Sequence, residues 1–513
     1  MDELQHHLVH AHKRVCYIAV RIGLRSGVGG RAGHARSCKL AERSTSFAER
    51  GPSTSKRRLL PWGFAVQHNA RARAPGYARD GACSRQTITI LAMFIRKVDS
   101  PIAMNFFKAP AKLVREARPL VRLTEAFGRA SIAAAPNVSA NALVIDARAL
   151  ATFTDLSWVH EVATKHSECA AFKEAGGRIV ILRRAHASLD PTAAACSEAL
   201  IGFGKSIAQE VGGRGATVNV LCDASAADSR SEVCEAPLDW LLSHKSCYVT
   251  GQELVVVRPA PADTEAAAST AALVTGAARG IGRATAMHLR KLQPTRALVL
   301  VDHPSAAGPL AAIAAELGGT ALPVDVTDTA AGATLAAAGA TVSGFGTVIH
   351  AAGITRDKTL AKMDLKKQWQ PVIDVNLRAV AVLDEALLTT PGALAPLGAG
   401  FVSFGSTSGI HGNLGQSNYA AAKSGLMGYA RAMGLAHEQR HRFACVAPGF
   451  IITEMTQKIP WLTRTLGAKL NSLGQGGLPE DVAAAVAFLA SPAAAGLLPG
   501  TTLRVCGQFR GGR

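Results

Sequence analysis

The fold is decided by the stretch AALVTGAARGIGRATAMHLR, residues 271–290. Its first five residues form a short, uninterrupted apolar run, which is typical of a buried parallel strand. Gly276, Gly280 and Gly282 follow at once, and the residues after them predict a helix. Glycines at this spacing let the backbone turn sharply and approach a pyrophosphate, which the free amides at the start of the helix can bind. The stretch therefore predicts an α/β domain with a Rossmann-type, doubly wound parallel sheet that binds a dinucleotide.

Acidic residues after the next strands bear on which dinucleotide is bound. The second predicted strand ends at Asp302, twenty residues beyond the last glycine. A carboxylate there can accept hydrogen bonds from the adenosine ribose and repels a 2′-phosphate, which favours NAD(H). Arg279 points the other way, because a guanidinium can pair with that phosphate, so NADP(H) remains the alternative. Asp325 and Val326 are expected beside the adenine, although an acidic residue at the end of a strand can also cap a helix. The residues expected at this half of the cofactor are Gly276, Arg279, Gly280, Ile281, Gly282, Asp302, Asp325 and Val326.

A second group of polar residues lies farther along the chain. Asn376 falls in a predicted helix, Ser406 ends a predicted strand, and Tyr419 follows thirteen residues later. Lys423 comes four residues after Tyr419, so both side chains lie on one helical face. The ammonium, together with an oxidised nicotinamide, is expected to favour the phenolate and to lower the pKa of Tyr419 from about 10. These four residues are the predicted catalytic group.

Residues 271–507 resemble the short-chain dehydrogenase/reductase family, and specifically the 3-oxoacyl-ACP (β-ketoacyl) reductases. The resemblance implies that Tyr419 donates a proton to the substrate carbonyl as hydride leaves the nicotinamide, while Ser406 holds the carbonyl oxygen. It implies that Lys423 binds the nicotinamide ribose and that Asn376 positions a water that relays protons. The spacing from Tyr419 in the family favours Ser406 over its neighbour Ser408. The residues expected at the nicotinamide half are Ala352, Gly353, Tyr419, Lys423, Pro448, Gly449 and Thr453.

Two further features follow from the resemblance. His350 stands where the family commonly has asparagine, which is expected to change the hydrogen bonding below the cofactor. The segment 454–477, with Trp461 among apolar residues, is expected to form a mobile lid over the acyl chain.

The chain also contains a degenerate copy of the same architecture. Segments 200–207 and 217–222 resemble 426–433 and 443–448 at a constant offset of 226 residues. At that offset, Ala193 and Ser197 stand where the second copy has its tyrosine and lysine. We therefore expect a flavodoxin-like or Rossmann-like domain without catalytic residues at 104–257, a linker at 258–269 and a catalytic domain at 270–513. The copy suggests the high-molecular-weight subgroup of these reductases, which resembles 3-oxoacyl-CoA reductases in using NADH.

The first 103 residues differ from the rest in charge and pattern. They hold 18 Lys and Arg against 6 Asp and Glu, so they carry +12 of the net charge of +19. They show no sustained helical or strand period and predict a disordered basic tail. Three interpretations remain open: a targeting peptide, a basic nucleic-acid arm, or upstream sequence translated from a start codon placed too early, with Met104 as the native start.

The composition limits the remaining functions. A length of 513 residues suggests two or three domains, and no apolar run approaches the roughly 18 residues of a membrane helix. The ten cysteines lack metal-binding spacing, so we expect free thiols, no metal site and a cytoplasmic protein. The expected reaction is reduction of a 3-oxoacyl thioester, on CoA or acyl carrier protein, to the (3R)-3-hydroxyacyl thioester. Alternatives are another ketone or alcohol as substrate, and a non-catalytic binding or assembly role for residues 104–257. We expect a homodimer or larger, with neither a nucleic acid nor a membrane as partner.

Overall fold

The computed structural model describes the following residues: 113–117, 121–128, 140–173, 176–185, 189–225, 234–257, 270–457 and 467–509. All of them belong to one compact unit of the chain, residues 82–513. The predictions for the tail 1–103, for a start at Met104 and for the linker 258–269 lie outside the described residues.

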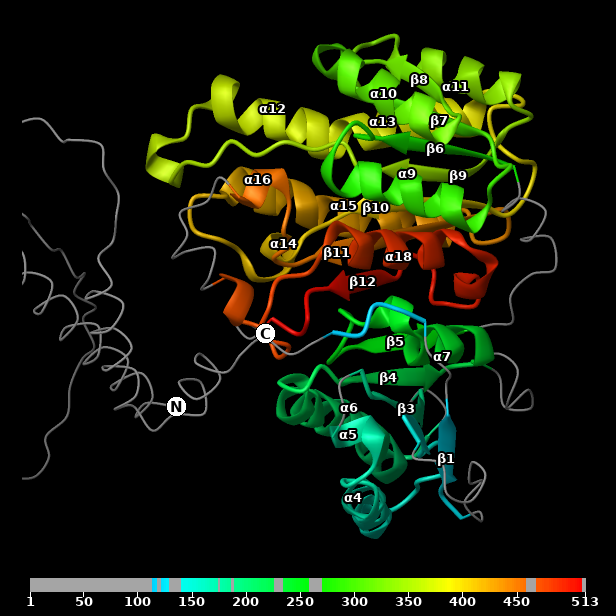
Figure 1. Ribbon diagram of the computed structural model, residues 1–513, viewed down its shortest axis with the longest axis vertical. Helices are drawn as coiled ribbons and strands as arrows, with labels where there is room; N and C mark the ends of the chain where they lie inside the picture. The colour runs from blue at the N-terminus through cyan, green and yellow to red at the C-terminus, as the bar shows by residue number, and fades with distance from the viewer. Residues whose placement is uncertain are drawn as a thin grey trace, which may run out of the picture. The chain divides into compact units, whose positions relative to one another are not determined.

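A seven-stranded parallel sheet forms the second half of the chain (Figure 1). Its strand order is β12-β11-β10-β9-β6-β7-β8, and every neighbouring pair is parallel. The order reverses between β6 and β9, and in doubly wound sheets dinucleotides bind beyond the carboxyl ends of the strands at this point. The predicted fold class is confirmed. The strands are β6 (Ala271–Thr275), β7 (Leu298–Asp302), β8 (Thr320–Pro323), β9 (Phe345–His350), β10 (Ala399–Phe404), β11 (His441–Pro448) and β12 (Thr502–Val505).

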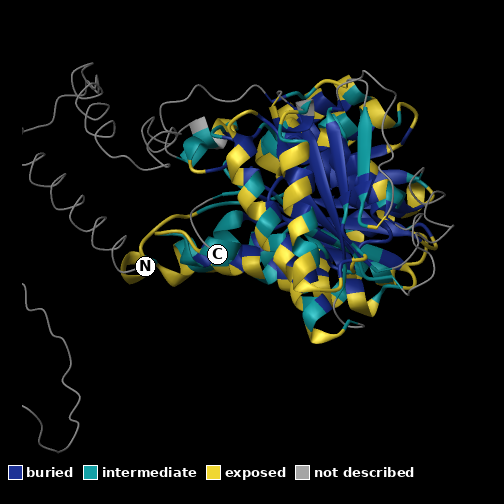
Figure 2. Cartoon of the chain, turned by 90° about the horizontal axis from the view of Figure 1, so that it is seen from below, coloured by how far each residue is buried: buried dark blue, intermediate teal, exposed yellow. Residues whose placement is uncertain are grey.

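Helices cover both faces of this sheet, because successive side chains of each strand point to opposite faces. Ala272 and Val274 of β6 belong to the core under α9, α10 and α18, whereas Leu273 belongs to the core under α11 and α13. Figure 2 shows the strands buried between helices whose outer faces are exposed. The helices are α9 (Gly280–Leu292), α10 (Ala307–Leu317), α11 (Ala331–Thr341), α12 (Gln370–Ile373), α13 (Ala379–Thr389), α14 (Thr407–His411), α15 (Ser417–Ala436), α16 (Glu454–Gln457) and α18 (Pro479–Ala490).

A separate five-stranded parallel sheet lies in the first half, with the order β1-β2-β3-β4-β5. Because this order is strictly sequential, the sheet contains no point where the order reverses and opens a crevice for a ligand. In the described residues it corresponds to β6 and β9–β12 without a counterpart of β7 and β8, the strands that precede the residues expected at the adenosine side. Its elements are β1 (Arg122–Ala126), β2 (Ala142–Asp146), α4 (Leu156–Lys165), α5 (Ala170–Lys173), β3 (Arg178–Arg184), α6 (Pro191–Gly212), β4 (Thr217–Asp223), α7 (Glu235–Leu242) and β5 (Glu253–Val256).

The two copies meet through equivalent elements. Trp240 of α7 stacks on Phe488 of α18, with ring centroids 4.2 Å apart. At the neighbouring edges of β5 and β12, the side chain of Gln252 donates to the carbonyl of Arg504 (2.6 Å) and accepts from its amide (3.0 Å). One cluster of buried apolar residues therefore contains members from both copies.

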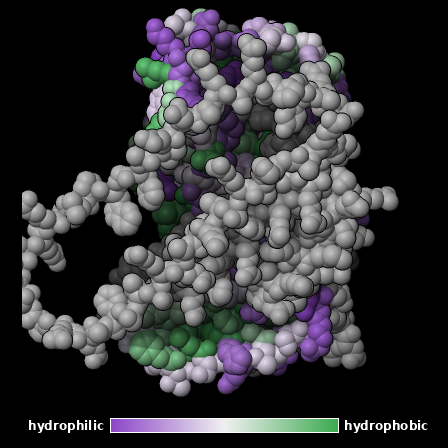
Figure 3. All heavy atoms as spheres, turned by 90° about the vertical axis from the view of Figure 1, so that its left-hand side faces the viewer, coloured by the Kyte–Doolittle hydropathy of each residue, from purple (hydrophilic) through white to green (hydrophobic). Residues whose placement is uncertain are grey.

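The surface of the described residues is mixed in polarity. On the face drawn in Figure 3, hydrophilic residues predominate at the upper end of the visible described surface, and at the lower end a hydrophobic patch lies beside hydrophilic residues. Within the part of the chain that the structure describes, no helix combines the length and apolar character that a membrane crossing requires.

Candidate active site

The glycine turn between β6 and α9 forms a cradle that side chains would fill. Gly276 and Gly280 have φ of +65° and +58°, values that side chains disfavour. A Cβ on Gly276 would lie 2.7 Å from the amide nitrogen of Ala352, and one on Gly282 would lie 2.1 Å from the carbonyl oxygen of Gly276. Ile281 packs against the core, while Arg279 is exposed just before α9. The bare backbone at a helix start fits a pyrophosphate, as the sequence predicts.

At the expected adenosine side, Asp302 and Asp325 both lie next to His303, a residue that sequence reasoning did not single out. Asp302 accepts hydrogen bonds from the amides of Ala278 (2.9 Å) and His303 (2.8 Å). The imidazole of His303 lies 3.5 Å from the carboxylate of Asp325. Partial burial raises the pKa of Asp325, but hydrogen bonds from Thr327 and the nearby His303 outweigh it and lower that pKa overall. Asp325 thus caps the turn at Thr327, and Val326 beside it is half-buried. The only signal for His303 in the sequence is its position directly after Asp302.

Asn376 lies in a π-helical turn, Asp374–Arg378, that interrupts the helix between α12 and α13. Such turns are frequent at functional sites because they displace side chains from the regular helical face. The buried Asn376 amide accepts from the amide of Ile354 (2.9 Å) and donates to its carbonyl (2.8 Å). A Cβ on Gly353 would lie 2.7 Å from Asn376 Oδ1 and 3.5 Å from Lys423 Nζ. The structure therefore brings Gly353, Asn376 and Lys423 together.

Ser406 and Tyr419 meet at the carboxyl end of β10. Ser406 precedes α14, its Oγ accepts from the amide of Ser408 (3.1 Å), and its side chain hydrogen-bonds Tyr419. The hydroxyl of Ser408 instead donates to Gln416 (3.2 Å), so the choice of Ser406 over Ser408 agrees with the geometry. Lys423 Nζ lies 5.5 Å from the centroid of the Tyr419 ring, on the same face of α15.

The pKa values of this pair differ from the expectation. Burial raises the pKa of Tyr419, and the hydrogen bond from Ser406 only partly opposes it. Burial also lowers the pKa of Lys423 to about 8. The predicted lowering invoked an oxidised nicotinamide together with the ammonium. In the protein alone the pKa of Tyr419 shifts upward, because enclosure of the phenol disfavours its charged form. A phenol with a raised pKa keeps its proton at neutral pH, which suits a proton donor.

The loop after β11 borders the expected carboxamide position. Gly449 donates to the carbonyl of Val505 (2.9 Å), and a Cβ on Gly449 would lie 2.6 Å from the Cβ of Cys506. Thr453 donates its amide to Thr456 Oγ1 (2.8 Å), which in turn donates to the carbonyl of Ile451 (2.8 Å). The run that begins at Pro448, the last residue of β11, is thus held by close backbone contacts on both sides.

His350 and Asn418 support the site from beneath. His350 is 2 % exposed, and its Nε2 lies 2.7 Å from Asp384 Oδ1, so the two side chains form a buried pair. Asn418 is fully buried, donates to the carbonyls of Arg356 (3.1 Å) and Gln368 (2.8 Å), and accepts from the amide of Tyr419 (2.7 Å). We missed Asn418 in the sequence, where its only signal is its place immediately before the tyrosine.

The described end of the predicted lid segment is buried. Trp461 lies outside the described residues. Asn471 and Leu473, near the end of the segment, are 3 % and 0 % exposed. This part of the segment is packed against the first half of the chain through Tyr248, and mobility of the segment stays a prediction.

In the first copy, a buried arginine that pairs with a half-buried glutamate fills the place of the catalytic group. The sheet register matches Arg178 with Phe401, so Arg183, five residues on, stands where the second copy has Ser406. Arg183 pairs with Glu253 and donates to Ser197 Oγ (3.1 Å), the residue in the place of the lysine. Ala193, in the place of the tyrosine, is a buried methyl group on α6.

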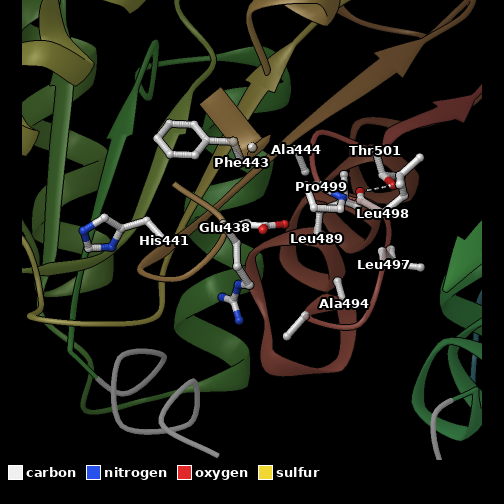
Figure 4. Close-up of a pocket in the computed structure, with 13 residues that line it drawn as sticks. Glu438, His441, Phe443, Ala444, Leu489, Ala494, Leu497, Leu498, Pro499 and Thr501 are labelled. Carbon is white, nitrogen blue, oxygen red and sulfur yellow. Dashed lines mark hydrogen bonds between the residues drawn. The ribbon is translucent and has the colours of Figure 1, made fainter. Parts of the chain in front are cut away.

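A small pocket lies elsewhere, at the amino-terminal end of β11 (Figure 4). Its lining includes His441 and Phe443 from β11 and Leu489 from α18. Because Pro448 and Gly449 lie at the opposite end of β11, this pocket is separate from the candidate active site.

Known proteins match the second half of the chain. A family profile described as enoyl-(acyl carrier protein) reductase matches residues 276–507. The 3-oxoacyl-[acyl-carrier-protein] reductase of Vibrio harveyi is 38% identical over 242 residues, covering 46% of this chain and 95% of the relative. That of Pseudomonas aeruginosa is 39% identical over 245 residues, with the same coverage. The (3R)-3-hydroxyacyl-CoA dehydrogenase of Canis lupus familiaris is 36% identical over 259 residues, covering 47% of this chain and 95% of the relative.

Proposed function

The chain belongs to the short-chain dehydrogenase/reductase family, in its branch of 3-oxoacyl reductases, and from this premise we propose that it reduces a 3-oxoacyl thioester to the (3R)-3-hydroxyacyl thioester. The observation that carries the proposal is the grouping of Ser406, Tyr419, Lys423 and Asn376 beside the glycine cradle. When bound, the reduced nicotinamide supplies the hydride. The chain itself supplies the proton and holds the carbonyl.

Tyr419 donates the proton in the proposed mechanism. Its raised pKa keeps the phenol protonated until the carbonyl oxygen gains negative charge. Ser406, already hydrogen-bonded to Tyr419, holds that oxygen in line with the phenol. Lys423 then returns a proton towards Tyr419, and Asn376 orders the path from solvent on the side of Gly353.

The cofactor is a nicotinamide dinucleotide, and we propose that it is NAD(H). The glycine cradle holds the pyrophosphate, and the carboxylate of Asp302, at the end of β7, meets the ribose. Lys423 binds the nicotinamide ribose, and the proposed border of the carboxamide is Pro448, Gly449 and Thr453. Arg279 and His303 near the adenosine end are the groups through which NADP(H) would bind instead.

Turnover of acetoacetyl-CoA with NADH against NADPH tests the function. We expect NADH to give the higher kcat/KM. Activity with an acyl-carrier-protein thioester but not with the CoA thioester would assign the carrier. Turnover of polyols or steroids without any 3-oxoacyl thioester would favour the alternative, a dehydrogenase of another ketone or alcohol.

Replacing Gly353 by Ala is expected to lower kcat/KM by roughly a hundredfold, because the new methyl group must displace Asn376 or Lys423. Asn376 cannot yield cheaply, since both ends of its amide bond the backbone of Ile354. Gly308→Ala is the matched control, because a Cβ there meets nothing within 4 Å. Normal steady-state kinetics in Gly353→Ala would show that Asn376 and Lys423 do not act as a group.

We propose that residues 104–257 form a non-catalytic domain that serves assembly, and that residues 270–513 form the catalytic domain of a cytoplasmic enzyme. The absence of a catalytic group is supported by the ion pair of the buried Arg183 with Glu253 and by the missing reversal in strand order. We expect a homodimer or larger. Light scattering that gave the mass of one chain would contradict it.

A further inference from the structure

Tyr248 is a buried residue of the first half that lies among backbone segments of the second half. It is 1 % exposed. A Cβ on Gly477 would lie 2.5 Å from Tyr248 Cε1, and a Cβ on Gly507 would lie 3.1 Å from Tyr248 Cε2. The amide of Gly507 also donates to the Tyr248 carbonyl (3.0 Å). The ring is therefore held between two glycines that leave it room.

The hydroxyl of Tyr248 is fixed as well. It donates to the carbonyl of Gln475 (2.8 Å) and accepts from the side-chain amide of Asn471 (3.2 Å). Burial raises the pKa of Tyr248, so the hydroxyl keeps its proton and remains a donor. The side chain thus anchors the segment 471–477 by both its ring and its hydroxyl.

These contacts lead directly to the loop after β11. The amide of Gly477 donates to the carbonyl of Phe450 (3.0 Å), and the amide of Ile452 donates to the carbonyl of Gly477 (2.8 Å). On the other side, Cys506, next to Gly507, packs against Gly449. Tyr248 therefore contacts both segments that flank residues 448–453.

We propose that Tyr248 is a positioning residue for residues 448–453 and so for the bound nicotinamide, although it belongs to the half without a catalytic group. This inference rests on the proposed function, in which 448–453 borders the carboxamide. In this proposal the first half of the chain contributes to cofactor binding without contacting the cofactor itself.

Two variants of the full chain test the inference through NADH binding, measured by nicotinamide fluorescence without acyl substrate. Tyr248→Phe removes only the hydroxyl and is expected to weaken binding about threefold, while Tyr248→Leu also removes the ring and is expected to weaken it about tenfold. Amide hydrogen exchange at 449–453 is expected to quicken in the same order.

Trp240→Leu is the matched control, because it removes a ring from the same interface that contacts Phe488 on α18 instead of residues 471–477. It is expected to lower the thermal midpoint at least as much as Tyr248→Leu and to leave NADH binding unchanged. Equal weakening in Trp240→Leu, or unchanged binding in both Tyr248 variants, would overturn the inference. A wild-type chain that neither binds NADH nor turns over a 3-oxoacyl thioester would contradict the proposed function instead, and hydrogen exchange at 449–453 would still report on positioning by Tyr248.

Discussion

Tyr419→Phe is expected to lower kcat for a 3-oxoacyl thioester by roughly a thousandfold, the usual contribution of a positioned general acid. The variant loses the hydroxyl that hydrogen-bonds Ser406 but keeps the ring beside Lys423. Binding of NADH should therefore change little. Single-turnover measurement of NADH oxidation separates the chemical step from binding and release.

Tyr429→Phe is the control for this experiment. Tyr429 lies on the same helix, α15, and its hydroxyl bonds Asp384, the partner of His350, and not Ser406. Its replacement should alter stability and leave kcat near the wild-type value. A Tyr419→Phe enzyme with normal single-turnover rates would refute the proposed proton donor, even if the substrate were correct.

Much of the site could be predicted because its residues act through local spacing. The glycine turn follows β6 directly, and Tyr419 and Lys423 lie one helical turn apart, so chain order alone places them. The direction of the Tyr419 pKa could not be predicted, because it depends on how far the fold encloses the phenol. Tyr419 is enclosed by elements that are distant in the sequence, so the four-residue spacing between Tyr419 and Lys423 does not reveal its enclosure.

Contacts between the two copies also could not be predicted from the sequence. The sequence of 454–477 is apolar and loop-like, and nothing within it reveals that Asn471 bonds Tyr248, far earlier in the chain. Likewise, the offset that aligns Ala193 and Ser197 does not reveal that Arg183 enters the space of the lost site. A repeat predicts architecture, whereas the contacts between copies depend on side chains that the repeat does not share.

Lys423→Met is expected to abolish turnover and at the same time to stabilise the fold at neutral pH. Lys423 is 4 % exposed, and burial lowers its pKa from 10.5 to about 8, so the folded state disfavours the charged form. A shift of this size corresponds to roughly 3 kcal/mol of lost stability at pH 7, an upper estimate because Met does not reproduce every contact.

The difference in stability between Lys423→Met and the wild type is expected to depend on pH. Between about pH 8 and 10.5 the unfolded chain binds more protons at Lys423 than the folded chain does. The contribution of Lys423 to the free energy of unfolding of the wild type should therefore rise through this pH window. Below the window, the loss of stability caused by burying the charged lysine is fully present. Lys423→Met has no group that titrates at this position, so its free energy of unfolding should not show this rise. In urea unfolding, the excess stability of Lys423→Met over the wild type should be largest near pH 7 and shrink towards pH 10.5.

Other groups that titrate in this range are common to both proteins and cancel in the difference between them. A Met variant less stable than the wild type at pH 7, or an advantage that does not change with pH, would show that the ammonium finds compensation in the fold. Burial of the charged lysine would then not lower the stability of the fold. The expected combination, a more stable and inactive protein, is the signature of a charge kept in place for its chemistry.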